Sequence, residues 1–225
     1  MDLNPGSDES SPSIERNEAT RDLLLRAAKS VFAKCGYEGA TVKQIATQAG
    51  VNVSLVSYHF NGKEGLYRTC FEEVGRQRLA ATERVLKTPL SAEDFRVRLQ
   101  LFTEEFFLWN LAEADVCVIL HRECVGEMPL TKDIFRDTFL KSFQIFSDFF
   151  ESARAAGILR KELNSLLTAG FFYGSLIHVV RTQTLVKETF GFSLEDKDYR
   201  DQIIEQAIYN LMHGTIDSTA RGQHP

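Results

Sequence analysis

Residues Thr41–Tyr67, TVKQIATQAGVNVSLVSYHFNGKEGLY, hold the signals for two short helices, a tight turn and the start of a third helix. Thr41 is followed three residues later by Gln44, which is the spacing of a capping box at a helix N-terminus. Apolar residues then recur at helical spacing until Gly50, a residue that ends a helix at little cost in the left-handed conformation. The first part of the stretch therefore predicts a helix of about two turns.

The second part of the stretch predicts another short helix and the beginning of a longer one. Asn52 stands where it can cap the second helix, and Val56 and Phe60 give that helix an inward face. Asn61, with Glu64 three residues on, has capping-box spacing for the third helix. Two short helices joined in this way form a helix-turn-helix, whose second helix enters the major groove of DNA.

At these residues the chain resembles the DNA-binding domain of the TetR family of bacterial one-component transcriptional regulators. The matching features, as they stand here, are AAKSVFAKCGYEGATVKQIATQAGV, then SYHF, then KEGLY. They lie within residues 21–71, less than a third of the chain. The resemblance implies sequence-specific DNA binding, most often repression that a small molecule relieves. It also implies a homodimer, and a long helix from Lys63 that links the DNA-binding domain to the rest.

The resemblance also implies which residues touch DNA. The first helix meets the DNA backbone with three residues, Thr41, Lys43 and Gln44. Three others match positions that usually contact phosphates, namely Tyr58, His59 and Lys63. Base-facing positions are Ser54, Leu55 and Ser57. Val53 stands where the family often has a basic residue and Ser57 where it often has Tyr, so we expect apolar contacts with thymine methyl groups there.

Composition is that of a packed globular protein. Of the 225 residues 44% are hydrophobic, and 17 are Phe. The four cysteines are too few and too scattered for a disulfide framework, so we expect reduced thiols. No signal-peptide stretch and no membrane-spanning run is evident, which predicts a cytoplasmic protein without a membrane partner.

The charge is unevenly distributed along the chain. The net charge is −5 in total, yet residues 18–67 contain six Lys and Arg against four Asp and Glu, a balance of +2. Residues 1–17 carry −3 and the remainder −4. The segment with the helix-turn-helix signals is therefore the positive part of the chain, although its excess is modest and predicts few phosphate contacts per subunit.

We predict an all-α fold with two domains. A Ser-rich acidic tail (1–18) precedes the three-helix DNA-binding domain (19–67), and a helical ligand-binding and dimerisation domain (68–217) is followed by a second tail (218–225). Beyond the helix that starts at Lys63, apolar periodicity predicts helices at about 91–111, 115–125, 131–156, 164–187 and 195–213.

The stretch Leu166–Val180 is apolar around its whole circumference, as expected for a helix buried on more than one side. Gly170 and Gly174 would let another helix approach closely. Such a helix contacts either its own core alone or also a second subunit; we predict the latter. The predicted dimer residues are Gly170, Gly174, His178, Ile203, Ala207 and Ile208. Because one short recognition helix reads few bases, a dimer on a palindromic operator is expected.

Aromatic residues are dense between positions 95 and 173, and together they are suited to enclosing an apolar or aromatic small molecule. Each one taken singly also fits an ordinary core. The predicted ligand-contacting residues are Phe102, Phe106, Trp109, His121, Arg122, Phe135, Phe139, Phe143, Phe172 and Tyr173. Arg122 either pairs with Glu123 inside the protein or meets an anionic ligand.

Two other functional classes are weighed against DNA binding. Cys117, His121 and Cys124 share one helix face, which leaves metal or redox sensing open as an alternative. A helical ligand-binding protein that acts through protein contacts is the second. The sequence holds no phosphate loop, nucleophile elbow or His-Glu-x-x-His pair. We therefore predict no enzymatic activity, cofactor or resident metal.

Overall fold

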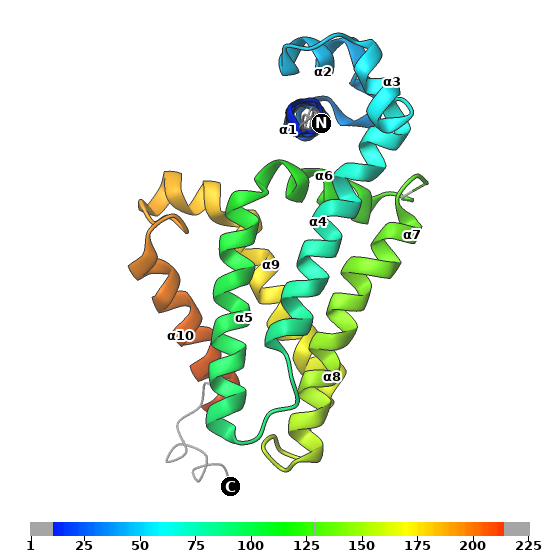
Figure 1. The fold of residues 1–225 in the computed structure, drawn as a ribbon. Helices are drawn as coiled ribbons and strands as arrows, with labels where there is room; N and C mark the ends of the chain where they lie inside the picture. The colour runs from blue at the N-terminus through cyan, green and yellow to red at the C-terminus, as the bar shows by residue number, and fades with distance from the viewer. Residues whose placement is uncertain (1–10, 128, 214–225) are drawn as a thin grey trace, which may run out of the picture. The chain divides into compact units, whose positions relative to one another are not determined.

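The computed structural model describes residues 11–127 and 129–213 of the chain (Figure 1). Every regular element in these ranges is helical, so the predicted all-α fold is confirmed. The helices are α1 (Ser11–Gly39), α2 (Val42–Ala49), α3 (Ser54–Phe60), α4 (Lys63–Val85), α5 (Ala92–Ala112), α6 (Ala114–Val125), α7 (Lys132–Phe135), the π-helix η1 (Arg136–Leu140), α8 (Lys141–Ala155), α9 (Ser165–Phe190) and α10 (Lys197–His213). The predicted tail 218–225 lies outside the described residues.

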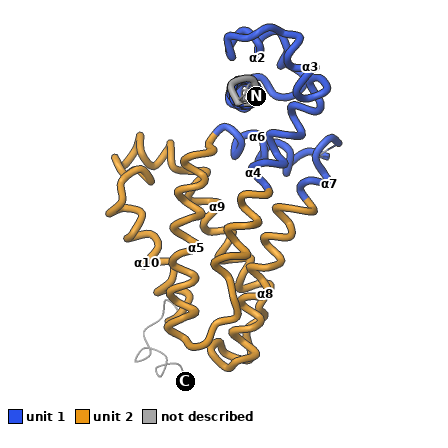
Figure 2. Tube along the Cα trace, viewed as in Figure 1, with its two compact units in different colours: residues 1–75, 115–135 blue, residues 76–114, 136–225 orange. Residues whose placement is uncertain are grey.

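The chain divides into two compact units (Figure 2). Unit 1 comprises residues 1–75 and 115–135, and unit 2 comprises residues 76–114 and 136–225. The domain limits drawn from the sequence, which follow one another along the chain, stay a prediction. The units are not consecutive, because residues 115–135 pack with the N-terminal helices rather than with their neighbours in sequence.

The first helix differs from its predicted limits at one end and agrees with them at the other. α1 begins at Ser11, although the sequence predicted a tail as far as residue 18. Its first turns are polar, and a prediction from apolar periodicity cannot detect such turns. The predicted break at Gly36 is confirmed, since this residue has φ 70° and ψ 177°.

The helix predicted for residues 131–156 is confirmed in its limits, since helical residues run from Lys132 to Ala155, but it is not a regular α-helix throughout. The structure has three helical pieces there, with the π-helix η1 between α7 and α8. A π-turn adds one residue to the helical repeat and so rotates the apolar stripe of α8 relative to that of α7. The Phe residues keep a regular spacing through this segment, so the sequence pattern does not reveal the π-turn. Phe139, which lies within the π-turn, is only partly buried.

An aromatic cluster forms the core of unit 1 beneath α2 and α3. The rings of Phe32 and Tyr67 meet edge to face with centroids 4.8 Å apart, and Tyr67 contacts Phe71 at 5.2 Å and Tyr37 at 4.9 Å. Such edge-to-face pairs stabilise the core beyond the burial of their area. The cluster joins the end of α1 to the first half of α4.

Polar contacts attach α6 to α4 within the same unit. The Tyr67 hydroxyl donates to Glu123 Oε1 at 2.7 Å, and the Thr131 hydroxyl donates to Glu123 Oε2 at 2.8 Å. Burial and the Glu123 carboxylate raise the pKa of Tyr67, so the phenol remains a neutral donor. The Arg122–Glu123 pair considered from the sequence does not form. Arg122 is exposed, and its Nη1 lies 3.4 Å from the Phe32 carbonyl oxygen.

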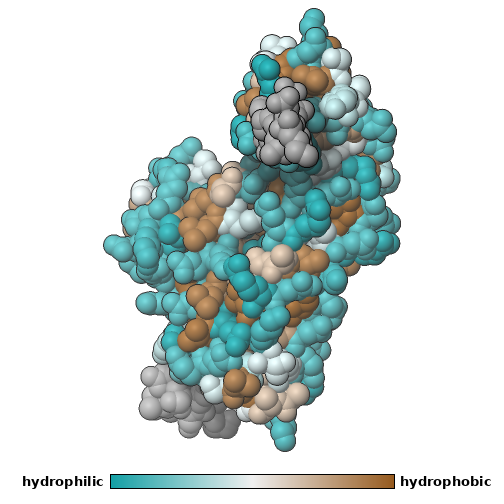
Figure 3. Space-filling model, in the orientation of Figure 1, coloured by the Kyte–Doolittle hydropathy of each residue, from teal (hydrophilic) through white to brown (hydrophobic). Residues whose placement is uncertain are grey.

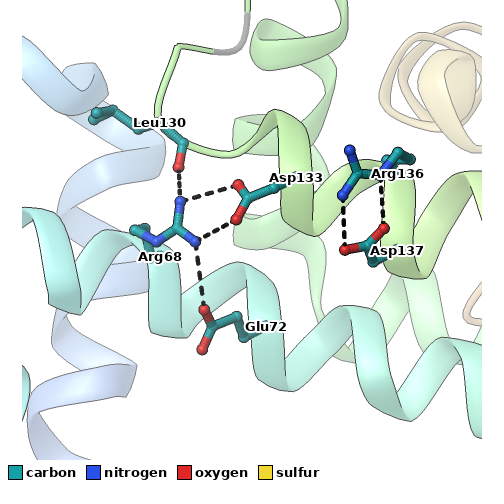
Figure 4. Close-up of polar contacts among 6 residues, drawn as sticks. All are labelled: Arg68, Glu72, Leu130, Asp133, Arg136 and Asp137. Atoms are coloured by element: carbon teal, nitrogen blue, oxygen red, sulfur yellow. Dashed lines mark hydrogen bonds and ion pairs between the residues drawn. The ribbon is translucent and has the colours of Figure 1, made fainter.

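Arg68 makes the second link, between α4 and α7 (Figure 4). Its guanidinium donates to both carboxylate oxygens of Asp133, at 3.0 and 2.7 Å, and to the Leu130 carbonyl oxygen. Glu72, one turn further along α4, lies 3.8 Å from the same guanidinium. A two-pronged pair of this kind fixes geometry better than a single contact, so it orients α7 on α4.

Unit 2 is a bundle in which α5 contacts α9 and α10, and α8 contacts α9. Its core is rich in Phe. Phe95 stacks on Phe149 with centroids 4.8 Å apart, and Phe146 contacts Phe150 at 5.1 Å. In the part of the chain that the structure describes, no helix is both long and apolar enough to cross a membrane. The face seen in Figure 3 is mostly hydrophilic, with apolar side chains in small separate patches.

The Arg68–Asp133 pair predicts a pH-dependent stability for unit 1. The hydrogen bond from Arg68 lowers the pKa of Asp133 from 3.8 to about 2. Because the folded-state pKa is depressed, the stabilisation is complete above the unfolded pKa near 4 and is lost as the pH falls towards 2. Asp133→Asn should therefore lower Tm slightly at pH 7.

Thermal unfolding measured at a series of pH values, from neutral pH down to the acidic pH at which Asp133 becomes protonated, would check this prediction. The difference in Tm between wild type and Asp133→Asn should shrink below about pH 4. Asp22→Asn, at an exposed position on α1, is the matched control. A difference that stays constant across the whole pH range would contradict the assignment.

Candidate nucleic-acid interface

The helix α2 begins and ends as the sequence predicts. The Thr41 hydroxyl accepts from the Gln44 backbone N–H at 3.1 Å, and Gln44 Oε1 accepts from the Thr41 N–H at 2.9 Å. This is a complete capping box. Gly50 closes the helix with φ 68° and ψ 31°. Both ends of α2 are thus set by local hydrogen bonds and backbone conformation.

The helix α3 begins as predicted but ends differently. Asn52 Oδ1 accepts from the Ser54 backbone N–H at 2.9 Å. The prediction that Asn61 caps α4 is wrong. Asn61 instead ends α3 in the left-handed conformation, with φ 61°, and its N–H donates to the Ser57 carbonyl oxygen at 3.0 Å. Asn tolerates that conformation better than most residues, and Gly62, with φ 101°, completes a two-residue connection.

Gly65, in the first turn of α4, is a residue that the sequence analysis missed. A Cβ at this position would lie 1.8 Å from the Phe60 carbonyl oxygen. The end of α3 therefore packs directly on the α4 backbone, and no other residue fits there without moving one of the helices. The only signal in the sequence was a second glycine three residues after Gly62.

The outward face of α3 is formed by four exposed residues, Val53, Ser54, Ser57 and Tyr58. Their spacing places them on one side of the helix, while Val56 and Phe60 are buried on the other side. Tyr58 is 71% exposed and Val53 46%. Leu55 is partly buried at the edge of this face.

The predicted backbone-contacting residues of α2 lie around an open concavity of about 450 Å³. Thr41, Lys43 and Gln44 are exposed. The lining also includes Lys34 at the end of α1, which the sequence analysis did not single out. Two ammonium groups therefore stand at one concave surface, as expected where a phosphate backbone passes.

Two of the predicted phosphate contacts are engaged within the unit. The Lys63 ammonium lies 4.3 Å from the centroid of the Tyr37 ring and 3.5 Å from the Glu38 carbonyl oxygen. His59 packs edge to face on Tyr58, and its Nε2 is enclosed without a hydrogen-bond partner among the described residues. A phosphate contact through that nitrogen would need the ring to turn.

The predicted ligand residues fall into two groups. Seven belong to unit 2, where Phe102, Phe106 and Phe143 each contact the Tyr173 ring, with centroid separations of 6.4, 5.5 and 5.4 Å. Phe172 joins the same core. The remaining unit 2 residues are Trp109 and Phe139, both partly buried. His121, Arg122 and Phe135 belong to unit 1.

The cysteine and histidine face of α6 shows no metal geometry. Among the described residues no three His, Cys, Asp or Glu side chains are placed to hold a metal ion. Cys117 and His121 are partly buried. Cys124 is exposed as a residue, yet partial burial of its sulfur, and then the Glu123 carboxylate, raise the pKa of its thiol. A raised pKa reduces the thiolate fraction on which reactivity depends.

Of the predicted dimer residues, Gly174 and His178 on α9 are exposed and Gly170 is half-buried, while those on α10 are more buried. A Cβ added at Gly170 or Gly174 would meet nothing within 4 Å, and His178 is exposed. Their apolar neighbours on α9 include Phe171, which is 78% exposed. Ile203 and Ala207 are partly buried. The assignment of Ile208 is wrong, because its side chain packs in the core of its own unit and is only 5% exposed.

A family model described as bacterial regulatory proteins of the tetR family matches residues 24–70. This span contains α2, α3 and the turns described above. YttP of Bacillus subtilis, a probable HTH-type transcriptional regulator, is 24% identical over 133 residues, 59% of this chain and 64% of that protein. BetI of Vibrio campbellii, an HTH-type transcriptional regulator, is 29% identical over 105 residues, 47% of this chain and 52% of that one. The chain thus matches less than two thirds of the length of either relative.

A similar fold occurs in a solved transcriptional regulator, FadR from Bacillus subtilis, in complex with stearoyl-CoA. The TM-score is 0.68, with 87% of this chain and 99% of that chain covered at 18% identity. The names of all three proteins describe transcriptional regulators, in the case of YttP a probable one.

Gly65→Ala should destabilise unit 1 by about 2 kcal/mol or more, because the added Cβ forces α3 and α4 apart. Gly39→Ala is the control, since its Cβ would meet only Cys35 Cβ at an ordinary 3.5 Å. Thermal unfolding followed by circular dichroism measures both. Equal unfolding temperatures for the two variants would show that the close approach of Phe60 is not needed.

Proposed function

We propose that this chain, which belongs to the TetR family of bacterial regulatory proteins, acts as a sequence-specific DNA-binding regulator of transcription. Repression released by a small-molecule inducer is the most economical form of this activity. The observation that carries the proposal is the exposed face of α3, held in place by a capped α2 and a two-residue turn into α4. A regulator of chromosomal genes acts where the chromosome lies, so a cytoplasmic location follows from the same proposal.

In this proposal α3 enters the major groove with Ser54 and Ser57 towards the base edges. Val53, at the start of the same face, is suited to a thymine methyl group rather than to a phosphate. Tyr58 extends furthest from the helix and is placed to reach the DNA backbone. Sequence preference would therefore come from small polar and apolar contacts, with no arginine on this face of α3.

Charge makes only a small contribution in this arrangement. Lys43 on α2 and Lys34 on α1 are exposed, whereas the Lys63 ammonium contacts Tyr37. The first backbone N–H groups of α4 add a positive helix end. A few phosphate contacts per subunit give moderate affinity, and a second subunit raises it by binding a second half-site.

We infer that the second subunit docks on α9. The exposed apolar residues Leu166, Leu167 and Phe171 flank Gly170, where nothing stands within 4 Å of an added Cβ. A glycine in a helix interior costs stability, and a closely approaching partner helix accounts for such a residue. A two-fold dimer would carry two α3 helices and so would bind a palindromic or near-palindromic operator.

The proposal that a small molecule binds to this protein rests on the aromatic cluster of unit 2. Phe102, Phe106, Phe143 and Tyr173 come from three helices and meet around one centre. The solved FadR relative in complex with stearoyl-CoA has the same fold. An apolar small molecule among these rings is therefore the inducer class that we propose.

A helical ligand-binding protein that acts through protein contacts is the competing function. In such a protein the helix-turn-helix would have no function. The exposed apolar and aromatic side chains of Val53 and Tyr58 on α3 argue against this. Incubation with DNA from upstream of its own gene separates the two functions. Retarded migration of that DNA supports regulation, and its absence at micromolar protein supports the competitor.

Lys43→Ala should weaken operator binding and its salt dependence, because one ammonium per subunit is removed from the DNA backbone. The slope of log affinity against log salt should fall by about 0.9 per lost contact, or about 2 for a dimer. Fluorescence anisotropy with labelled operator over a salt series measures it. Lys161→Ala, at an exposed lysine of unit 2, serves as the control. An unaltered slope would remove Lys43 from the interface.

Gly174→Leu should weaken dimerisation at least about tenfold, or about 1.4 kcal/mol, by blocking close approach of a second α9. The single subunit has open space at this position, so its own fold should not suffer. Ala155→Leu, which enlarges an exposed small residue at the end of α8, is the matched control. Sedimentation over a concentration series gives both dissociation constants. Equal values would place the dimer contact elsewhere.

A further inference from the structure

Arg78 is a buried cation in unit 2 that the sequence analysis did not single out. It lies on α4, three residues after Gly75, and is 4% exposed. Its guanidinium carbon lies 4.5 Å from the Phe106 ring centroid, 5.0 Å from that of Phe102 and 5.5 Å from that of Trp109. Three rings of α5 thus surround one charge.

No carboxylate balances this charge in the described part of the chain. Arg78 Nη2 is enclosed and has no hydrogen-bond partner there. The indole Nε1 of Trp109 is likewise enclosed without a partner. Two unused N–H donors therefore occur around one aromatic cluster, although buried donors are nearly always satisfied.

Other arginines of unit 2 have hydrogen-bonding partners that Arg78 lacks. Arg84, Arg98 and Arg154 each form an ion pair with a carboxylate, at 2.6, 2.9 and 2.5 Å. Arg200, which is also buried, donates through Nη1 to the Leu194 and Glu195 carbonyl oxygens at 2.7 and 3.0 Å, although its Nε has no partner among the described residues. Among the described residues Arg78 therefore differs in that its guanidinium faces three aromatic rings and neither pairs with a carboxylate nor satisfies Nη2.

Aromatic faces offset only part of the cost of burying a guanidinium, because they accept no directed hydrogen bond in its plane. The missing partner is an anion that lies in that plane. A carboxylate matches the fork of a guanidinium, and an indole N–H can serve one of its oxygens.

We infer that Arg78 and Trp109 Nε1 bind the carboxylate of an organic acid whose apolar body lies among Phe102, Phe106 and Tyr173. The inference deepens the proposed function by naming the inducer class as an apolar monocarboxylate, and it rests on that proposal. Tyr173 and Trp109 are only partly buried, so the cluster is not sealed from solvent. A ligand held here acts on α4, the helix that begins at the candidate DNA-binding site.

Trp109 is the sole tryptophan of the chain, so its fluorescence reports on this site. Decanoate and 4-phenylbutyrate are titrated against decanol and 4-phenylbutanol, which have the same carbon skeletons without the charge. Each acid should change the emission in a saturable way and bind at least about tenfold more tightly than its alcohol. Equal binding of acid and alcohol, or no saturable change up to about 1 mM acid, would overturn the inference.

Arg78→Met should abolish the preference for the acid, whereas Arg84→Met, at an exposed position of the same helix, should retain it. Arg78→Met should also melt at the same or a higher temperature than wild type, because it replaces an unpaired buried charge by an apolar chain. A purely structural role predicts the reverse, with a lowered Tm and an intact preference for the acid. Arg78→Lys, which keeps the charge and loses the fork, should bind the acid with intermediate affinity, and it serves as the test if Arg78→Met fails to fold.

Operator binding by the ligand-free protein shows whether the carboxylate site alone is wrong or the proposed function as a whole is wrong. If wild type retards operator DNA but shows no preference for acids, only the carboxylate site is lost. If it binds no operator, the proposed function fails whatever the fluorescence shows. Release of operator by decanoate in wild type, but not in Arg78→Met, would support both.

Discussion

The two-residue turn between α3 and α4 is the constraint on which the rest of unit 1 depends. Asn61 and Gly62 both have positive φ, which brings the Phe60 carbonyl oxygen onto the backbone of α4 at Gly65. With so short a connection α3 cannot rotate about its axis independently of α4. The direction of the outward side of α3, which includes Tyr58, is therefore fixed by backbone geometry rather than by surface side chains.

The same first half of α4 also holds a segment that is distant in sequence. Tyr67 and Arg68 are consecutive residues that bind Glu123 and Asp133 respectively, so residues 115–135 belong to the compact unit of the N-terminal helices. A neutral phenol serves one link and a two-pronged ion pair the other. Because α4 continues into unit 2, one helix contributes to the candidate DNA-binding surface at its start and to the aromatic cluster near Arg78 further on.

Unit 2 combines a densely packed aromatic core with a buried guanidinium, that of Arg78, which pairs with no carboxylate among the described residues. Phe95, Phe149 and Phe150 pack ring against ring in ordinary core geometry. Around Arg78 the rings surround a cation instead, and two donor atoms, Arg78 Nη2 and Trp109 Nε1, have no partner within the described ranges. A core optimised only for stability would replace that guanidinium by an apolar chain. Stability given up at one place in a fold is a common sign of a binding role.

Local hydrogen bonds made much of this protein predictable from sequence. The Thr41–Gln44 capping box, the left-handed Gly50 and the break at Gly36 need only neighbouring residues, so their spacing sufficed. Asn61 was misassigned because asparagine either caps a helix or ends one, and the length of the turn decides between them. The burial of Ile208, the π-turn at η1, the exclusion of a Cβ at Gly65 and the unpartnered Arg78 depend on atoms from distant segments. The sequence alone determined most of the helices and the helix-turn-helix motif, because helical periodicity and caps are short-range. The tertiary structure decided which faces are buried and which charge lacks a partner, because these follow from packing between segments that no local pattern encodes.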